Sequence, residues 1–89
     1  MAGKGAGAAG AVLRNEAFAV DWVTVASSNV AAIGYSPDFA RLWVRFHNGS
    51  VYAFLDEPES VYQGYLSAPS KGRYHHYHVK DQFGYLRVS

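Results

Sequence analysis

The feature that most constrains this chain is a pair of alternating runs joined by Asn48-Gly49. The runs read RLWVRFH and SVYAFL, and with the Asn-Gly pair they fill residues 41–55. An Asn-Gly pair between two alternating runs is the strongest short-range signal of a β-hairpin. Side chains alternate between the two faces of a strand. One face of the first strand therefore carries Leu42, Val44 and Phe46, and the other carries Arg41, Trp43, Arg45 and His47.

The length of the hairpin loop decides where the rings of the second strand point. A two-residue loop places Tyr52 and Phe54 on the basic face, as an exposed aromatic platform. A three-residue loop, with Gly49 in a left-handed bulge, shifts the pairing by one residue. Tyr52 and Phe54 then join the apolar face, and Ala53 faces out. We favour the bulged register because it buries more aromatic area in a small core.

Length and composition indicate one small globular domain. The chain has 89 residues, of which 49% are hydrophobic, and its seven Tyr and five Phe are expected to fill much of the core. It contains no cysteine, which excludes disulfides and thiolate metal sites. No apolar run approaches the length of about 18 residues that a membrane span needs.

The N-terminal residues differ from the rest of the chain. Residues 1–11 are almost entirely Gly and Ala, with no helical or strand periodicity. Residues 12–20 are compatible with a short helix or an extended arm. We therefore divide the chain into a flexible Gly/Ala-rich N-terminal arm, residues 1–20, and a single domain, residues 21–89.

The pattern of elements in the domain predicts an α+β fold. Residues 22–26 and 30–35 read as strands before the hairpin, with turns at 27–29 and 36–38. Pro58 and neighbouring carboxylates predict a helix start, and Pro69 predicts its end. Residues 70–73 read as a polar loop, 74–79 and 85–88 as extended segments, and 81–84 as a turn. We expect a small antiparallel sheet of three to five strands with one α-helix packed on a face.

Four segments, in order, resemble the KTSC domain family, named for the C-terminal region of some lysyl-tRNA synthetases. They are SSNVAAIGY (27–35), the hairpin with its aromatic-x-aromatic second strand, PESVY (58–62) and APSKGRY (68–74). The central Y-x-Y of the family is represented here by Tyr52-Ala53-Phe54, so the second hydroxyl is missing. The resemblance implies kinship with small stand-alone bacterial and phage proteins. It also implies RNA binding as the suggested role of the family.

The histidines and serines of the sequence do not form a catalytic or metal-binding motif. In an extended segment only His76 and His78 share a face, while His75 opposes them, so three ligands do not converge. No nucleophile motif surrounds any serine, and cysteine is absent. The sequence therefore predicts a non-catalytic protein without cofactor or metal.

Charge distribution points instead to binding at the C-terminal end. Residues 56–70 contain three carboxylates and no cation, whereas residues 71–89 contain four cations and one carboxylate. Cations interleaved with rings can hold a phosphate backbone and stack on bases. The predicted nucleic-acid-binding residues are Lys71, Arg73, Tyr74, His75, His76 and Lys80.

Two functions follow from these residues. The preferred one is a non-catalytic module that binds RNA or single-stranded DNA in the cytoplasm. The alternative is a protein–protein interaction or structural module, such as a phage accessory or virion component, which docks through its arm and a sheet edge.

Overall fold

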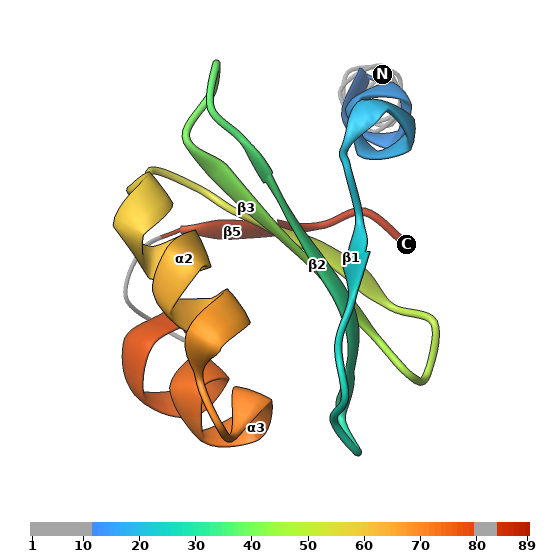
Figure 1. Ribbon diagram of the computed structural model, residues 1–89. Helices are drawn as coiled ribbons and strands as arrows, with labels where there is room; N and C mark the ends of the chain where they lie inside the picture. The colour runs from blue at the N-terminus through green and yellow to red at the C-terminus, as the bar shows by residue number, and fades with distance from the viewer. Residues whose placement is uncertain (1–11, 80–83) are drawn as a thin grey trace.

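The computed structural model describes residues 12–79 and 84–89, and its centre is a five-stranded antiparallel sheet (Figure 1). The strands lie side by side in chain order as β1 (Val23–Thr24), β2 (Val30–Ser36), β3 (Arg41–Phe46), β4 (Val51–Phe54) and β5 (Tyr85–Arg87). Between β4 and β5 the chain forms α2 (Glu59–Ser67), α3 (Lys71–Tyr74) and the π-helix η1 (His75–Val79). The predicted α+β class is confirmed.

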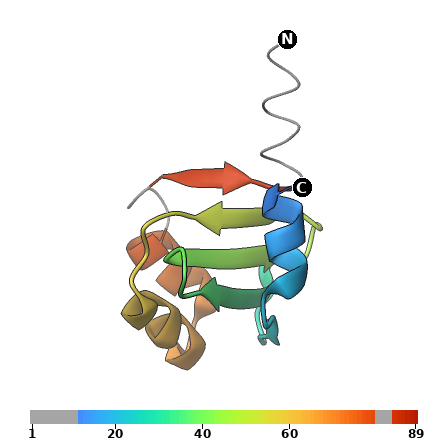
Figure 2. The same cartoon turned by 90° about the horizontal axis from the view of Figure 1, so that it is seen from above.

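Helices cover both faces of the sheet (Figures 1 and 2). The helices α2, α3 and η1 lie on what we call the first face. A helix at residues 12–19 lies on the opposite, second face. The sequence predicted one helix on one face, so the second layer is an addition. Among the described residues, no helix is long and apolar enough to span a membrane.

The hairpin adopts the bulged register. Leu42 pairs with Phe54 and Val44 pairs with Tyr52, which leaves three residues in the loop. Gly49 closes that loop with a φ of 91°, a conformation that glycine adopts without steric cost. Tyr52 and Phe54 therefore share the first face with Leu42 and Val44, as the favoured register predicted.

The main core lies between the first face and the helices. Its buried side chains are Val30, Ile33, Leu42, Val44, Phe54, Tyr65 and Val79. On α2, Tyr65 is fully buried, and Val61, Tyr62 and Leu66 pack beside it in this core. The helix ends before Ala68, whose backbone is extended ahead of Pro69.

The second face is buried too, and this corrects the expected exposure of Ala53. Ala53 and Trp43 are both 0% exposed and form a core with Leu13 and Val20 from the N-terminal segment. Val20 lies directly on Gly34, where an added Cβ would come within 2.1 Å of a Val20 methyl carbon. Residues 12–20, assigned to the arm, thus contribute to this core. The division into arm and domain stays a prediction, and residues 1–11 lie outside the described residues.

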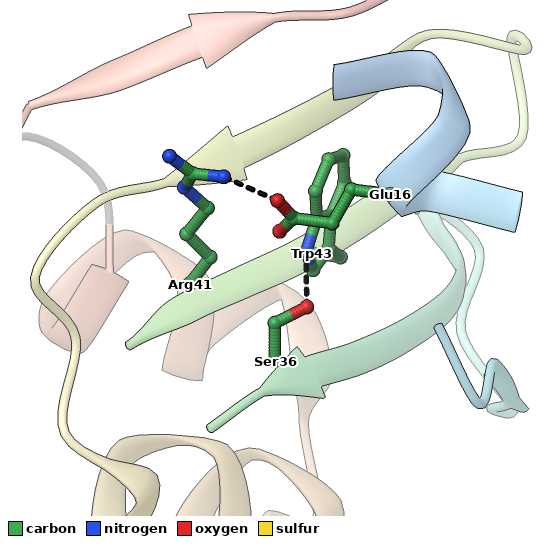
Figure 3. Close-up of polar contacts among 4 residues, drawn as sticks. All are labelled: Glu16, Ser36, Arg41 and Trp43. Carbon is green, nitrogen blue, oxygen red and sulfur yellow. Dashed lines mark hydrogen bonds and ion pairs between the residues drawn. The ribbon is translucent and has the colours of Figure 1, made fainter. Parts of the chain in front are cut away.

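Polar contacts attach the N-terminal helix to β3 (Figure 3). The Arg41 guanidinium forms an ion pair with Glu16 of the helix. Trp43, beneath that helix, donates its indole N–H to the Ser36 hydroxyl of β2 at 3.0 Å. The ion pair therefore joins the N-terminal helix to β3, and the indole hydrogen bond joins β3 to β2.

The segment after α2 differs from its prediction. Residues 70–73 were expected to be a loop and 74–79 extended, but residues 71–79 are helical throughout. Ser70 caps this helix by accepting a hydrogen bond from the Arg73 amide at 3.3 Å. Tyr74, His75 and Val79 face inward, a helical spacing that the period-two reading missed. Lys80 and most of the predicted 81–84 turn lie outside the described residues.

A buried carboxylate lies in the connection from β4 to α2. Glu57 is 1% exposed, and neither of its carboxylate oxygens has a hydrogen-bond partner among the described residues. Its backbone carbonyl accepts a hydrogen bond from the Tyr35 hydroxyl at 2.7 Å, which holds the segment against the sheet. Burial raises the pKa of Glu57 from 4.5 to about 7.

Burial of Ala53 predicts that Ala53→Lys destabilises the fold. Overpacking alone costs about 1–3 kcal/mol, and burying the ammonium adds to that cost. Leu86→Lys is the matched control, because Leu86 pairs with Ala53 on β5 and is 42% exposed. We expect the control to change the free energy of unfolding, measured in urea, by less than about 0.5 kcal/mol. Equal stability of the two variants would show that the second face is open.

Glu57 predicts a specific pH dependence of stability. As the pH rises from 4.5 to about 7, the unfolded chain releases a proton that folded Glu57 retains, so the free energy of unfolding falls. Glu57→Gln should match wild type at pH 4 and exceed it at pH 8, in denaturant titrations at each pH. Glu59→Gln, an exposed change in the first turn of α2, is the control. Parallel curves for wild type and both variants would contradict this assignment.

Candidate functional site

A hollow lined mainly by aromatic rings lies on the first face, near the hairpin loop. We call it the aromatic pocket, and its volume is about 310 Å³. Its lining residues are Asn29, Phe46, Asn48, Ser50, Tyr52, Phe54, His75 and Tyr85. Five of these eight side chains are aromatic rings, and the other three are small and polar.

Strand register brings the rings of the pocket together. Tyr52 and Phe54 are two residues apart on β4, and their rings stack with centroids 6.1 Å apart. On β5, Tyr85 pairs with Phe54, and its ring lies 5.7 Å from that of Tyr52. Phe46 completes the set from the end of β3, 5.8 Å from Tyr52. Because Tyr85 is 53% exposed, the ring cluster reaches the solvent.

His75 forms the helical wall of the pocket. Its ring meets Phe46 and Phe54 edge-on, each at 5.3 Å between centroids. Its Nδ1 lies 2.9 Å from the hydroxyl of buried Tyr65. Burial raises the pKa of Tyr65, so this hydroxyl stays protonated at neutral pH. The histidine that the sequence singled out for binding is therefore held in a defined orientation.

The rim of the pocket is polar. Asn48 Oδ1 accepts hydrogen bonds from both the amide and the hydroxyl of Ser50. With its oxygen occupied in this way, the Asn48 side chain has its amide nitrogen left to donate. The Arg87 guanidinium lies 5.9 Å from the Tyr52 ring centroid and brings a positive charge beside the rings. Together these groups can stack on a planar ligand, hydrogen-bond its edge and attract an anion.

Two of the sequence-predicted binding residues have structural contacts. The Lys71 ammonium donates to the carbonyls of Leu66 and Ala68, at 2.9 and 2.6 Å, and so closes the C-terminal end of α2. The Tyr74 hydroxyl donates to the Val61 carbonyl at 2.9 Å. Gly64 makes room for it, since an added Cβ there would lie 2.3 Å from the Tyr74 hydroxyl.

The other predicted residues lie elsewhere. Arg73 and His76 are exposed on α3 and η1, and His76 meets the Tyr77 ring edge-on at 4.9 Å. His75 lines the aromatic pocket, and Lys80 is outside the described residues. The predicted set therefore does not form one cluster in the structure. Within residues 12–79 and 84–89, no three His, Cys, Asp or Glu side chains gather to hold a metal ion.

Sequence reasoning missed most of the aromatic pocket. It placed Tyr52 and Phe54 on the core face, as the structure confirms, but it did not predict that their rings also line a pocket. Phe54 is 5% exposed at the base of the pocket, and Tyr52 is partly exposed above the core. A signal was present in the sequence. In the bulged register, alternation places Phe46, Tyr52 and Phe54 on one face, and Tyr85 follows in the last predicted strand.

The fold and the pocket together define a small α+β domain with an aromatic pocket on one face of its sheet. A KTSC domain model matches residues 26–83, so the chain belongs to the KTSC family, and the resemblance seen in the sequence is confirmed. A solved KTSC domain protein from Yersinia pestis is similar, with a TM-score of 0.74 and 34% identity. The match covers 79% of this chain and 99% of that one.

Relatives in the family include large and small proteins. A lysine–tRNA ligase from Nostoc sp. is 37% identical over 62 residues, which cover 70% of this chain and 11% of that enzyme. A protein from Tsukamurella paurometabola is 37% identical over 59 residues, which cover 66% of this chain and 88% of that protein. The chain thus spans about a tenth of the ligases that it matches.

Contacts of Tyr74 predict that its hydroxyl contributes to folding. Tyr74→Phe leaves the Val61 carbonyl without this donor and should cost about 1 kcal/mol of unfolding free energy. Arg73→Gln, one residue away and exposed, should leave the melting temperature unchanged. Thermal unfolding followed by circular dichroism checks both. A melting temperature that is insensitive to Tyr74→Phe would contradict the structural role.

Proposed function

We propose that this KTSC domain is a non-catalytic binding module for single-stranded nucleic acid, RNA in the first place. The observation that carries the proposal is the aromatic pocket, whose Tyr85 ring is exposed and whose Tyr52 ring is partly exposed, with amides and a cation beside them. Proteins recognise single-stranded RNA by stacking splayed-out bases on aromatic side chains and by hydrogen-bonding their edges. The pocket contains both kinds of group.

Each part of the pocket has a counterpart in a nucleotide. Tyr85 and Tyr52 offer ring faces for a base, and stacking of this kind contributes about 1–3 kcal/mol per base. The Asn48 amide nitrogen can donate to a base acceptor, while Arg87 can neutralise a phosphate. None of the pocket's lining residues is acidic, so no carboxylate of the lining repels the backbone.

The relatives support RNA over DNA. Two of them carry the name lysine–tRNA ligase, which denotes enzymes that act on an RNA, and contain a segment similar to this chain. The small relatives show that such a segment also forms nearly a whole protein. We infer that the domain supplies RNA contacts and leaves catalysis to other parts of the ligases.

A second candidate is a protein-interaction module, and the N-terminal helix favours it. Phe18 is 88% exposed and Val12 is 64% exposed there, on the side of the sheet opposite the aromatic pocket. A phage accessory or virion component would use such side chains to dock on neighbours. Concentration-dependent self-association in analytical ultracentrifugation, abolished by Phe18→Ser, is the result that this candidate expects.

Fluorescence polarisation tests the RNA proposal. Labelled single-stranded RNA, single-stranded DNA and duplex RNA are titrated with the domain at two salt concentrations. We expect Tyr85→Ala to weaken single-strand binding by about 5- to 150-fold, and Arg87→Gln to lower the salt slope by about 0.7. Phe39→Ala, an equally exposed ring away from the pocket, should change nothing. A wild-type domain that binds none of these probes at low salt would refute the proposal.

A further inference from the structure

Two further hollows follow the aromatic pocket along the helical side of the molecule. The Lys71 hollow is lined by residues that include Ser27, Ser28, Asn29, Pro69, Ser70 and Lys71. Asn29 lines both this hollow and the aromatic pocket, so the two adjoin. The Arg73 hollow, with Arg73, Tyr77 and His78, shares Pro69 and Ser70 with the Lys71 hollow. The three hollows therefore adjoin one another in this order, and we call them together the track.

The charged side chains along this track are cationic. Among the described residues, none of the side chains that line the three hollows is acidic. A hollow elsewhere, by contrast, is lined by Glu16, Asp21 and Asp38. Lys71 and Arg73 lie in the middle and at the far end of the track, and Arg87 lies beside the aromatic pocket. The track is thus a cationic path with neutral polar groups between its charges.

Aromatic rings stand at both ends of the track. The aromatic pocket forms one end. At the other end Tyr77 is 67% exposed, and the Tyr74 and His78 rings lie 4.5 Å apart beside it. Rings that follow a cationic groove are the arrangement by which proteins hold successive bases of a single strand. A single nucleotide in the aromatic pocket would leave Lys71 in the middle of the track, and Arg73 at its far end, without a ligand.

We propose that one nucleic-acid strand follows the whole track, with a base in the aromatic pocket, its backbone past Lys71 and Arg73, and a second base on Tyr77. This inference rests on the proposed function and extends it from a base pocket to a site for several consecutive nucleotides. It also accounts for Lys71 and Arg73, which the sequence nominated but which lie outside the aromatic pocket. Lys71 acts here through its charge, since its ammonium is held by two carbonyls.

Length-dependent binding tests the track. Polarisation competition with a mononucleotide, a trinucleotide and an octanucleotide of RNA is compared for wild type, Tyr85→Ala, Tyr77→Ala and Arg73→Gln. We expect Tyr85→Ala to weaken every length. Tyr77→Ala and Arg73→Gln should each weaken the octanucleotide about fivefold or more and leave the mononucleotide unchanged. Wild type should bind the octanucleotide more tightly than the shorter probes.

Matched controls lie on the opposite side of the sheet. Phe18→Ala removes an exposed ring, and Arg14→Gln removes an exposed cation, both from the N-terminal helix. Neither should change affinity for any length, and melting temperatures establish that each variant is folded. If the far-end variants bind the octanucleotide as the controls do, the track is wrong and the base pocket stands. If wild type binds no probe of any length, the proposed function itself fails, and the track with it.

Discussion

The register between β3 and β4 determines which face of the sheet each side chain of β4 lies on. Gly49 adopts a φ of 91°, which allows the three-residue loop. With that loop Phe54 pairs with Leu42, whereas a two-residue loop would pair it with Trp43. Because side chains alternate, a slip of one residue would exchange the two faces of β4. The aromatic pocket, the main core and the second core all depend on this one turn.

Both faces of the sheet are buried, and different elements pack on each of them. On the second face the N-terminal helix packs Leu13 and Val20 over Trp43 and Ala53. On the first face α2 places Tyr65 at the centre, while η1 reaches the hairpin end through His75. Between η1 and β5 the rings of Tyr52 and Tyr85 are left partly uncovered. The same aromatic side chains that stabilise the core therefore also form a surface that can bind a ligand.

Hydrogen bonding orders the groups around this surface. The contact of Tyr65 with His75 sets one wall of the pocket, and Ser50 holds the Asn48 amide at its rim. Lys71 connects α2 to α3 and keeps the cation near the adjoining hollow. Such contacts reduce the side-chain freedom that a ligand would otherwise have to restrict, which favours binding. Away from this surface, Glu57 is a buried carboxylate whose oxygens have no partner among the described residues.

Local patterns in the sequence were enough for the elements that depend on neighbouring residues. The Asn-Gly turn, the alternation of β3 and β4, and the prolines at either end of α2 each act within a few residues, so the hairpin, its register and that helix were predictable. The KTSC family was recognisable from short segments for the same reason. Of the residues that the sequence singled out for binding, His75 lines the aromatic pocket, while Lys71 and Arg73 line the two hollows that follow it.

The helix at residues 74–79, the burial of Ala53 and the aromatic pocket depend on contacts between residues that are distant in the chain. Residues 74–79 resemble a strand in sequence, but only when that segment is helical is Val79 buried in the core while half-buried His75 packs its ring on Phe54. Ala53 looked exposed because nothing near it in the chain indicates that residues 12–19 cover it. The pocket joins residues from 29 to 85, so no local window contains it. Alternation assigns a side chain to a face of the sheet, but only packing determines whether that face is covered, and by what.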